Sequence, residues 1–424
     1  MYYREVALPD DFPTAGDFSV PEHLVGALAE VDQLYATIVA PLEESLAHRF
    51  AGVDDYLDTD GRLHPEIWEA RRHIMRASGA AGLYGAFLPS RIGGRDYDRE
   101  DMLWVEERVY SYGLRLNPAL LSWSEGATPR VIFAHDHHRD EFTLPLVRGE
   151  KTAFHAITEP GAGSNLFDLK TNAVQRNGDW VLNGHKAYIT NAFEADVAQV
   201  LAVTHPGNGR RSFTYFQFDT HEARARGFST GKVYQTMFND GITGEVMFDD
   251  LVLPADSVIG EVGGAFDIAM ASINWTRMRR GGMCSGWGQL LIHRMVERAK
   301  SRVIGGTPLG ANQGIAWMVA DSYADWMMAR SLSLSVAKEL DHPGPWWKTP
   351  RPREEIRKIS AVKLTNDECF YRIADRALQL HGAAGVMRDT EINKLFQLAR
   401  NFRIPGGADE VQRNSIAEGL GLRF

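Results

Sequence analysis

The segment "AITEPGAGSN", residues 156–165, marks the point where a mostly helical sequence gives way to short β-type segments. Gly161, Ala162 and Gly163 stand beside Ser164, so the backbone N–H groups of this loop are open to close approach. Such a loop can wrap a flat ring or a pyrophosphate, but a glycine-rich segment is more often only a turn. Taken alone, the segment leaves both interpretations open.

A second segment favours the ligand-binding interpretation. The sequence "WVLNGHKAYITNA", residues 180–192, is typical of a strand, a tight turn at Asn183 and Gly184, and a second strand. The second strand ends in an aromatic ring at Tyr188 and a hydroxyl at Thr190. Both groups suit contact with a planar ligand.

The sequence around these segments predicts helices, then strands, then helices. From residue 21, Leu24, Leu28, Val31, Tyr35 and Ile38 recur at spacings of four and three, which predicts an amphipathic helix, and more helix follows towards residue 149. Short β-rich runs separated by Gly, Asn and Asp predict a small antiparallel β unit between about residues 151 and 260. Helical periodicity then returns and holds to about residue 420, broken at 304–313 and at the Pro/Trp-rich 341–353.

The composition excludes several classes of protein. A chain of 424 residues that is 44% hydrophobic and 24% charged can form two or three packed units. A net charge of −9 with no long Lys/Arg block argues against nucleic acid or an anionic membrane as partner. Cys284 and Cys369 do not make a disulfide framework, and because no Cys/His cluster has zinc spacing we expect no metal. Without a signal sequence or a membrane-length apolar run, a cytoplasmic protein is expected.

Together these segments resemble the acyl-CoA dehydrogenase family over nearly the whole chain. The resemblance implies an α+β fold with an N-terminal helical domain at 1–150, a middle β domain at 151–260 and a C-terminal four-helix bundle at 261–424. It also implies FAD as cofactor and an acyl-CoA or carrier-bound thioester as substrate. "AITEPGAGSN" corresponds to the family's flavin and thioester loop, although the usual Asp after the Ser is Asn165 here.

The resemblance assigns site residues by position. In "AYIT", an aromatic covers one face of the flavin ring and a threonine hydroxyl approaches flavin N5. "INWTRMRRGG", 273–282, looks like the start of the helix whose arginine shapes the acyl-CoA entrance. "SRVIGGTPLGANQ", 301–313, and the turn "LQLHGAAGV", 378–386, resemble segments that reach FAD from the neighbouring subunit, although Gly305 replaces the usual Phe. The residues implied to bind FAD are Ile157, Thr158, Gly163, Ser164, Tyr188, Ile189, Thr190, Arg302, Gln313, Gln379, Gly382 and Ala383, and those implied to bind substrate are Ser164, Asn274 and Arg277.

The catalytic base of the family has no counterpart in this sequence. Dehydrogenation needs a carboxylate within hydrogen-bond reach of the substrate α carbon. The family places it immediately before a glycine, in the segment that aligns with "IPGGADE" at 404–410, where this chain has Gly406. A rarer location, just before the arginine of the acyl-CoA helix, is Thr276 here.

Three explanations compete for the missing base. Asp409 or Glu410 could reach in through a shifted loop, although both suit the first turn of a helix. Glu125 could act from the N-terminal helix that we expect to line the acyl pocket, or it could be a surface acid at a helix end. Alternatively the enzyme needs no base and retains only the backbone N–H of Gly406 to polarise the thioester.

We therefore expect an FAD-dependent oxidoreductase that acts on an acyl thioester at the α,β bond and forms a homodimer or homotetramer. The alternatives are a base-less desulfinase or lyase, a flavin monooxygenase, and a non-catalytic homologue on the same fold. The sequence does not identify the acyl group or the electron acceptor.

Overall fold

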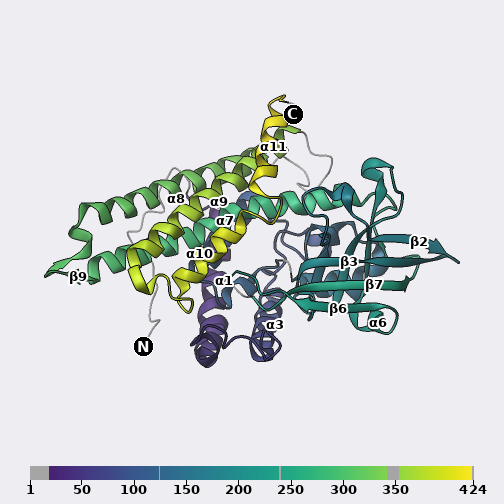
Figure 1. Cartoon of the computed structure of the whole chain (residues 1–424), viewed down its shortest axis with the longest axis horizontal. Helices are drawn as coiled ribbons and strands as arrows, with labels where there is room; N and C mark the ends of the chain where they lie inside the picture. Colours follow the sequence, from purple (N-terminus) through teal and green to yellow (C-terminus); the bar gives the residue numbers. More distant parts are fainter. Residues whose placement is uncertain (1–18, 124, 238–239, 341–352, 423–424) are drawn as a thin grey trace.

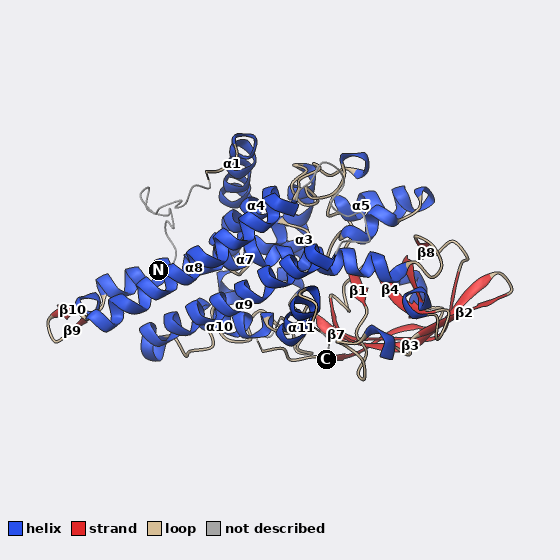
Figure 2. Ribbon diagram, turned by 90° about the horizontal axis from the view of Figure 1, so that it is seen from above, coloured by secondary structure: helices blue, strands red, loops and turns tan. Residues whose placement is uncertain are grey.

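The computed structural model describes residues 19–123, 125–237, 240–340 and 353–422. A group of N-terminal helices, a β-sheet unit and a set of long C-terminal helices follow one another along the chain (Figure 1). The long helices and the sheet extend to opposite sides of the molecule, and one helix, α7, reaches from one to the other (Figure 2).

The N-terminal unit is built from short helices around a hydrophobic core. Its α-helices are α1 (Val25–Leu34), α2 (Ala40–Ser45), α3 (Pro65–Ala80), α4 (Arg99–Ser111) and α5 (Leu144–Val147). The helix predicted from residue 21 is present, but a π-helical turn at Tyr35–Val39 divides α1 from α2. Of the predicted apolar stripe, Leu24 and Val31 are fully buried and the other three members are partly buried against the core, so the stripe does face inward.

The middle unit is a sheet of eight strands. They are β1 (Ala153–Ala156), β2 (Asn172–Arg176), β3 (Asp179–Thr190), β4 (Val197–Val203), β5 (Phe213–Asp219), β6 (Phe228–Val233), β7 (Thr243–Leu253) and β8 (Val258–Ile259). The order β6-β7-β3-β2-β4-β5-β8 is mostly antiparallel, while β1 pairs with β4 in parallel. Buried aromatic side chains, among them Phe154, Phe216 and Phe248, fill the core of this unit.

The predicted tight turn at Asn183 and Gly184 is wrong. These residues lie inside β3, which continues from Asp179 to Thr190 with a register shift between Leu182 and Gly184. The turn that joins β2 to β3 is the earlier Asn-Gly pair, Asn177 and Gly178, whose φ angles of 55° and 96° suit a hairpin turn with the twist of the strands. β3 stays extended because the long strand β7 pairs along its length.

The C-terminal unit consists of long helices packed side by side. They are α7 (Ala265–Ser301), α8 (Gln313–Leu340), α9 (Arg353–His381), α10 (Glu391–Phe402) and α11 (Asp409–Gly419). A small hairpin, β9 (Val303–Ile304) and β10 (Thr307–Pro308), joins α7 to α8 at the expected break. The second expected break, at 341–353, lies outside the described residues except for its last position.

Two further observations complete the fold. Cys284 and Cys369 are both buried and free. None of the helices in the described ranges is long and apolar enough to cross a membrane. The predicted fold class, helical domain then β domain then helical bundle, is confirmed.

Candidate active site

The glycine-rich loop after β1 is fixed by a buried ion pair. Lys186 Nζ on β3 lies 3.0 Å from Glu159 Oε1, and it also donates a hydrogen bond to the carbonyl of Ile157 at 2.7 Å. The other carboxylate contacts are backbone N–H groups of Lys170 and Thr171, each at 2.8 Å. The carboxylate therefore ties both ends of the loop to β3.

The charges of this pair are coupled. Burial lowers the pKa of Lys186 to about 8, and the charge of Glu159 opposes that shift. Burial acts to raise the pKa of Glu159, but the charge of Lys186 and hydrogen bonds at Thr171 and Lys170 outweigh it and leave the pKa below its ordinary value. Both groups are thus ionised at neutral pH.

The ion pair brings the two predicted flavin segments together. The N–H of Ala187 donates to the carbonyl of Thr158 at 3.0 Å, so the loop at 158–164 lies against the strand that carries Tyr188 and Thr190. Ser164 and Gly163 are exposed on this loop, and Thr158 is half-buried. Sequence reasoning missed Glu159 and Lys186, although a lysine at a buried position of a strand pattern was an available signal.

Tyr188 has an unusual backbone conformation. Its φ is 60°, in the left-handed region that bulky residues rarely adopt, and it lies within a register shift of β3 against β7. The residue is 59% exposed, and its ring stacks on that of Tyr234, with ring centroids 4.6 Å apart and planes 28° apart. Such strain collects at functional sites, where the surrounding structure maintains it.

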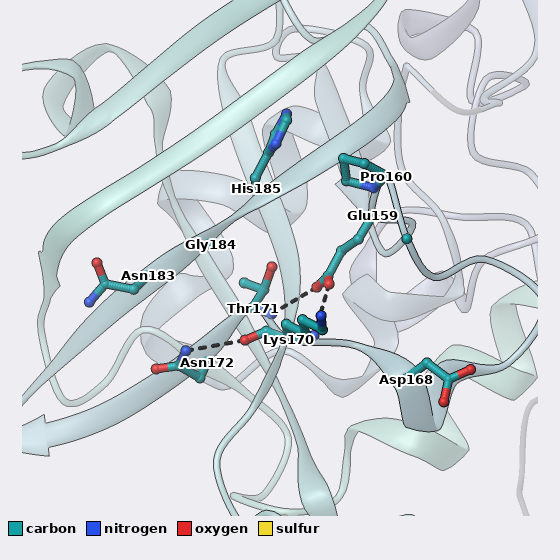
Figure 3. A pocket seen from close by; sticks show the side chains of 10 residues that line it. Glu159, Pro160, Asp168, Lys170, Thr171, Asn172, Asn183, Gly184 and His185 are labelled. Atoms are coloured by element: carbon teal, nitrogen blue, oxygen red, sulfur yellow. Dashed lines mark hydrogen bonds between the residues drawn. The ribbon is translucent and has the colours of Figure 1, made fainter.

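A hollow of about 360 Å³ lies beside the same loop but does not include the predicted flavin residues (Figure 3). Its lining residues are Glu159, Pro160, Gly161, Asp168, Lys170, Thr171, Asn172, Asn183, Gly184 and His185. Tyr188, Thr190 and Ser164 are not among them. The hollow is therefore distinct from the exposed aromatic face of Tyr188.

A second cluster joins the start of α7 to the loop before α11. Arg277 is 6% exposed, and its Nε donates to the carbonyl of Gly406 at 2.8 Å while Nη1 donates to Asn274 Oδ1 at 3.1 Å. Gly406 has a φ of 76°, and a Cβ there would meet only the Thr276 methyl at 4.0 Å. The structure thus brings Asn274, Arg277 and Gly406 together at one place.

Glu125 lies in a turn, not on the predicted helix. The following Gly126 and Pro129 lead into a 3₁₀ helix, Pro129–Phe133, so no regular helix passes through the residue. The Glu125 side chain is 16% exposed and lies 3.7 Å from Arg71 Nη1 of α3. Its carbonyl accepts a hydrogen bond from Ala153 at the start of β1, so the residue faces the junction of the helical and β units.

The two acids near the C-terminus have different environments. Asp409 is 2% exposed and is paired with Lys363 at 2.8 Å and with Arg403 at 3.2 Å, which commits its carboxylate to the packing of α9 and α11. Glu410 is exposed in the first turn of α11. Thr276, at the rarer family position, donates its hydroxyl to the carbonyl of Ser272 within α7.

The residues implied to reach a neighbouring subunit share one property. Arg302, Gln313, Gln379, Gly382 and Ala383 are all exposed. They lie where α7, α8 and α9 end or begin, towards the β9 tip in Figure 1. Large apolar side chains are exposed in the same segments, at Val303, Ile304, Trp317, Val386 and Met387.

Two family descriptions match this chain. "Acyl-CoA dehydrogenase, middle domain" matches residues 155–251, and "Acyl-CoA dehydrogenase, C-terminal domain" matches residues 263–421. Both descriptions belong to one family and together span most of the chain.

Relatives and solved structures agree with these matches. An acyl-CoA dehydrogenase of Bacillus subtilis is 29% identical over 82% of this chain and 89% of its own length. The (R)-benzylsuccinyl-CoA dehydrogenase of Thauera aromatica is 29% identical over 95% of this chain and 97% of its own. The structure of butyryl-CoA dehydrogenase from Megasphaera elsdenii superposes with a TM-score of 0.79 at 24% identity, covering 96% of this chain and 100% of that one.

Proposed function

This chain belongs to the acyl-CoA dehydrogenase family, and we propose that it is an FAD-dependent oxidoreductase that acts at the α,β bond of an acyl-CoA or carrier-bound acyl thioester. The observation that carries the proposal is the junction of the two flavin segments, fixed by the hydrogen bond from Ala187 to Thr158. The relatives named above are dehydrogenases of CoA thioesters, which supports this substrate class.

The residues present fit a flavin. The exposed Tyr188, stacked on the half-buried Tyr234, lies next to the strand residue that contacts the 158–164 loop, and flat rings stack favourably on such a face. We assign Ile157, Thr158, Gly163, Ser164, Tyr188, Ile189 and Thr190 to FAD within one subunit, and Arg302, Gln313, Gln379, Gly382 and Ala383 to FAD of the neighbouring one. When bound, FAD supplies an acceptor for the hydride lost from the substrate β carbon.

The thioester is held and polarised by this chain's own groups. Ser164, Asn274 and Arg277 are assigned to the substrate. The backbone N–H of Gly406 has no hydrogen-bond partner within the described residues, so it is available to donate to the thioester oxygen. A donor directed at the oxygen where charge develops stabilises the enolate-like transition state.

We assign the proton transfer to Glu125 as first choice. Its carboxylate is half-buried at the junction of the helical and β units, and Arg71 holds its charge in place. Asp409 is committed to Lys363 and Arg403, and Glu410 is exposed, so both are weaker candidates. If no carboxylate serves, the second candidate function is a reaction without an α-proton base, namely an elimination of a leaving group or flavin-dependent oxygen chemistry.

FAD sharing implies a homodimer or homotetramer. The exposed apolar side chains around Trp317 and Ile304 lie in the segments that carry the assigned partner-side residues. Sedimentation of the yellow holoprotein is expected to give a dimer or tetramer, and a monomer with full flavin occupancy contradicts the assignment.

The central experiment is anaerobic mixing of the purified flavoprotein with a panel of acyl-CoAs, followed by absorbance. Bleaching of the oxidised flavin with at least one thioester supports dehydrogenation. A spectrum that no thioester changes, together with reductant-driven oxygen uptake, supports oxygen chemistry instead.

A further inference from the structure

Three buried arginines lie close together on α7, and they differ in their partners. Arg279 is 2% exposed and is paired with Glu106 of α4. Arg280 is 1% exposed and lies 3.6 Å from Asp367 Oδ1 of α9. Two of the three cations therefore have a buried carboxylate as counter-charge.

Arg277 is the exception. It is 6% exposed, yet within the described parts of the chain no carboxylate lies within 4 Å of its guanidinium, and its hydrogen-bond partners are the neutral oxygens of Gly406 and Asn274. Burial alone lowers its pKa to about 10, so it remains protonated at neutral pH. A buried charge without a counter-charge is unfavourable unless something else supplies one.

Two glycines leave room beside this cation. A Cβ on Gly407 would lie 2.9 Å from Arg277 Nη2, so the glycine is what allows the guanidinium to lie against the loop. At Gly406 a side chain would enter open space bordered only by the Thr276 methyl. The resemblance to the family assigns its catalytic carboxylate to this position, and Gly406 has no side chain that could carry such a charge beside Arg277.

On the premise that the proposed function holds, we propose that the substrate brings the missing charge, and that Arg277 binds a carboxylate on the acyl group of a dicarboxylic acyl thioester. The acyl group then occupies the space that Gly406 leaves open, and the anionic end is held by a charge-assisted hydrogen bond from Nη2. Such bonds are stronger than neutral ones and select sharply against a substrate that lacks the anion.

The test compares matched thioesters of equal chain length. Glutaryl-CoA is compared with pentanoyl-CoA, and succinyl-CoA with butyryl-CoA, by anaerobic titration of the flavin spectrum and by the rate of flavin reduction. We expect each dicarboxylic thioester to bind roughly 10- to 100-fold more tightly than its neutral match, the range of a hydrogen bond to a charged group. Equal affinity, or preference for the neutral acyl group, overturns the proposal.

Variants identify the residue responsible. Arg277→Gln should abolish the preference, and Arg277→Lys should keep part of it, with FAD content unchanged in both. Arg130→Gln is the matched control, because Arg130 is also buried but packs beside the Thr128 hydroxyl and the Tyr215 ring. If Arg277→Gln weakens the binding of the dicarboxylic thioester and of its neutral match equally, the arginine binds a part that both share, such as the CoA phosphates, and the proposal is wrong.

The failure of this inference differs from the failure of the proposed function. If neutral acyl-CoAs reduce the flavin and dicarboxylic ones are not preferred, the proposed function holds and the inference about Arg277 is wrong. If no thioester of any chain length changes the flavin spectrum or reduces the flavin, the proposed function is wrong. The wild-type comparison decides the inference even if no Arg277 variant folds.

Discussion

Glu159 and Lys186 form an ion pair in the interior of the β unit, with 3.0 Å between Oε1 and Nζ, and this pair joins the glycine-rich loop to the strand that carries Tyr188. The lysine side chain is 0% exposed and the glutamate side chain 7%. The position of the predicted flavin loop therefore depends on two charged residues that are not themselves predicted to bind FAD, although Lys186 also donates a hydrogen bond to the carbonyl of Ile157, which is.

Lys186→Met should destabilise the protein and release the flavin, because it leaves the Glu159 carboxylate buried without its counter-charge. Breaking such a pair by removing one partner costs about 3–5 kcal/mol. The free energy of unfolding in urea and the flavin absorbance per protein measure the two effects. Arg226→Met is the control, since its pair with Glu222 at 3.1 Å is largely exposed and worth at most about 1 kcal/mol.

Tyr188→Gly should weaken flavin binding without loss of stability. Glycine adopts a φ of 60° at no steric cost, so the backbone strain at this position disappears, while the stacked ring is lost. We expect roughly fivefold weaker FAD binding, in keeping with about 1 kcal/mol for an aromatic stack. Fluorescence titration of apoprotein with FAD measures this, and unchanged affinity would mean that the Tyr188 face does not contact the flavin.

Much of this site could be predicted from the sequence because its parts are local. The glycine-rich loop and the "AYIT" strand each lie within one segment, and residue type alone indicates what they present. Glu159 with Lys186, and Arg277 with Gly406, are pairs from distant segments, and only the fold shows that they meet. The sequence motifs that resemble the family could not show which buried charged side chains have a partner of opposite charge.

The misplaced turn has a related cause. The chain has Asn-Gly pairs at 177–178 and 183–184, and local propensity alone does not choose between them. The choice depends on β7, which pairs with β3 on both sides of Gly184 and so keeps it inside the strand. The turn was therefore decided by a partner strand more than fifty residues further along the chain. Glu125 was placed on a helix by the resemblance to the family, and that resemblance did not show that this chain forms a turn at Glu125 and a 3₁₀ helix from Pro129.

Thr190→Val should lower the rate of flavin reduction more than it lowers stability. Valine keeps the β-branched shape at the end of β3 and removes only the hydroxyl. One lost hydrogen bond to the flavin is worth about 1 kcal/mol, or roughly a fivefold change in rate. Stopped-flow absorbance measures the rate, with Thr230→Val on β6 as the control. An unchanged flavin spectrum and rate in Thr190→Val would remove the residue from the site.

Gly406→Ala and Gly407→Ala should differ in stability. Both glycines have positive φ, 76° and 89°, where a Cβ costs roughly 1–2 kcal/mol. At Gly406 the new methyl enters open space, whereas at Gly407 it also meets Gln412 Nε2 at 2.8 Å and Arg277 Nη2 at 2.9 Å. Urea unfolding should therefore show a larger loss for Gly407→Ala. Equal losses would indicate that Arg277 is not held against this loop.

The identity of the base is tested by three substitutions. If Glu125 removes the substrate proton, Glu125→Gln should slow flavin reduction by about 10²–10⁴-fold, the usual contribution of a general base, with FAD content and fold unchanged. Glu410→Gln should have little effect, because that side chain is exposed in the first turn of α11.

Arg71→Gln distinguishes a catalytic role of Glu125 from a structural one. The change breaks the ion pair between Arg71 and Glu125, which are 3.7 Å apart, but leaves the carboxylate of Glu125 in place. A structural role for Glu125 predicts similar losses in Arg71→Gln and Glu125→Gln, since either change removes the same pair. A catalytic role predicts a large loss in Glu125→Gln alone. If Glu125→Gln reduces its flavin at the wild-type rate, no relocated base acts from this turn, and the base-less elimination or oxygen chemistry replaces α,β-dehydrogenation as the function of the site.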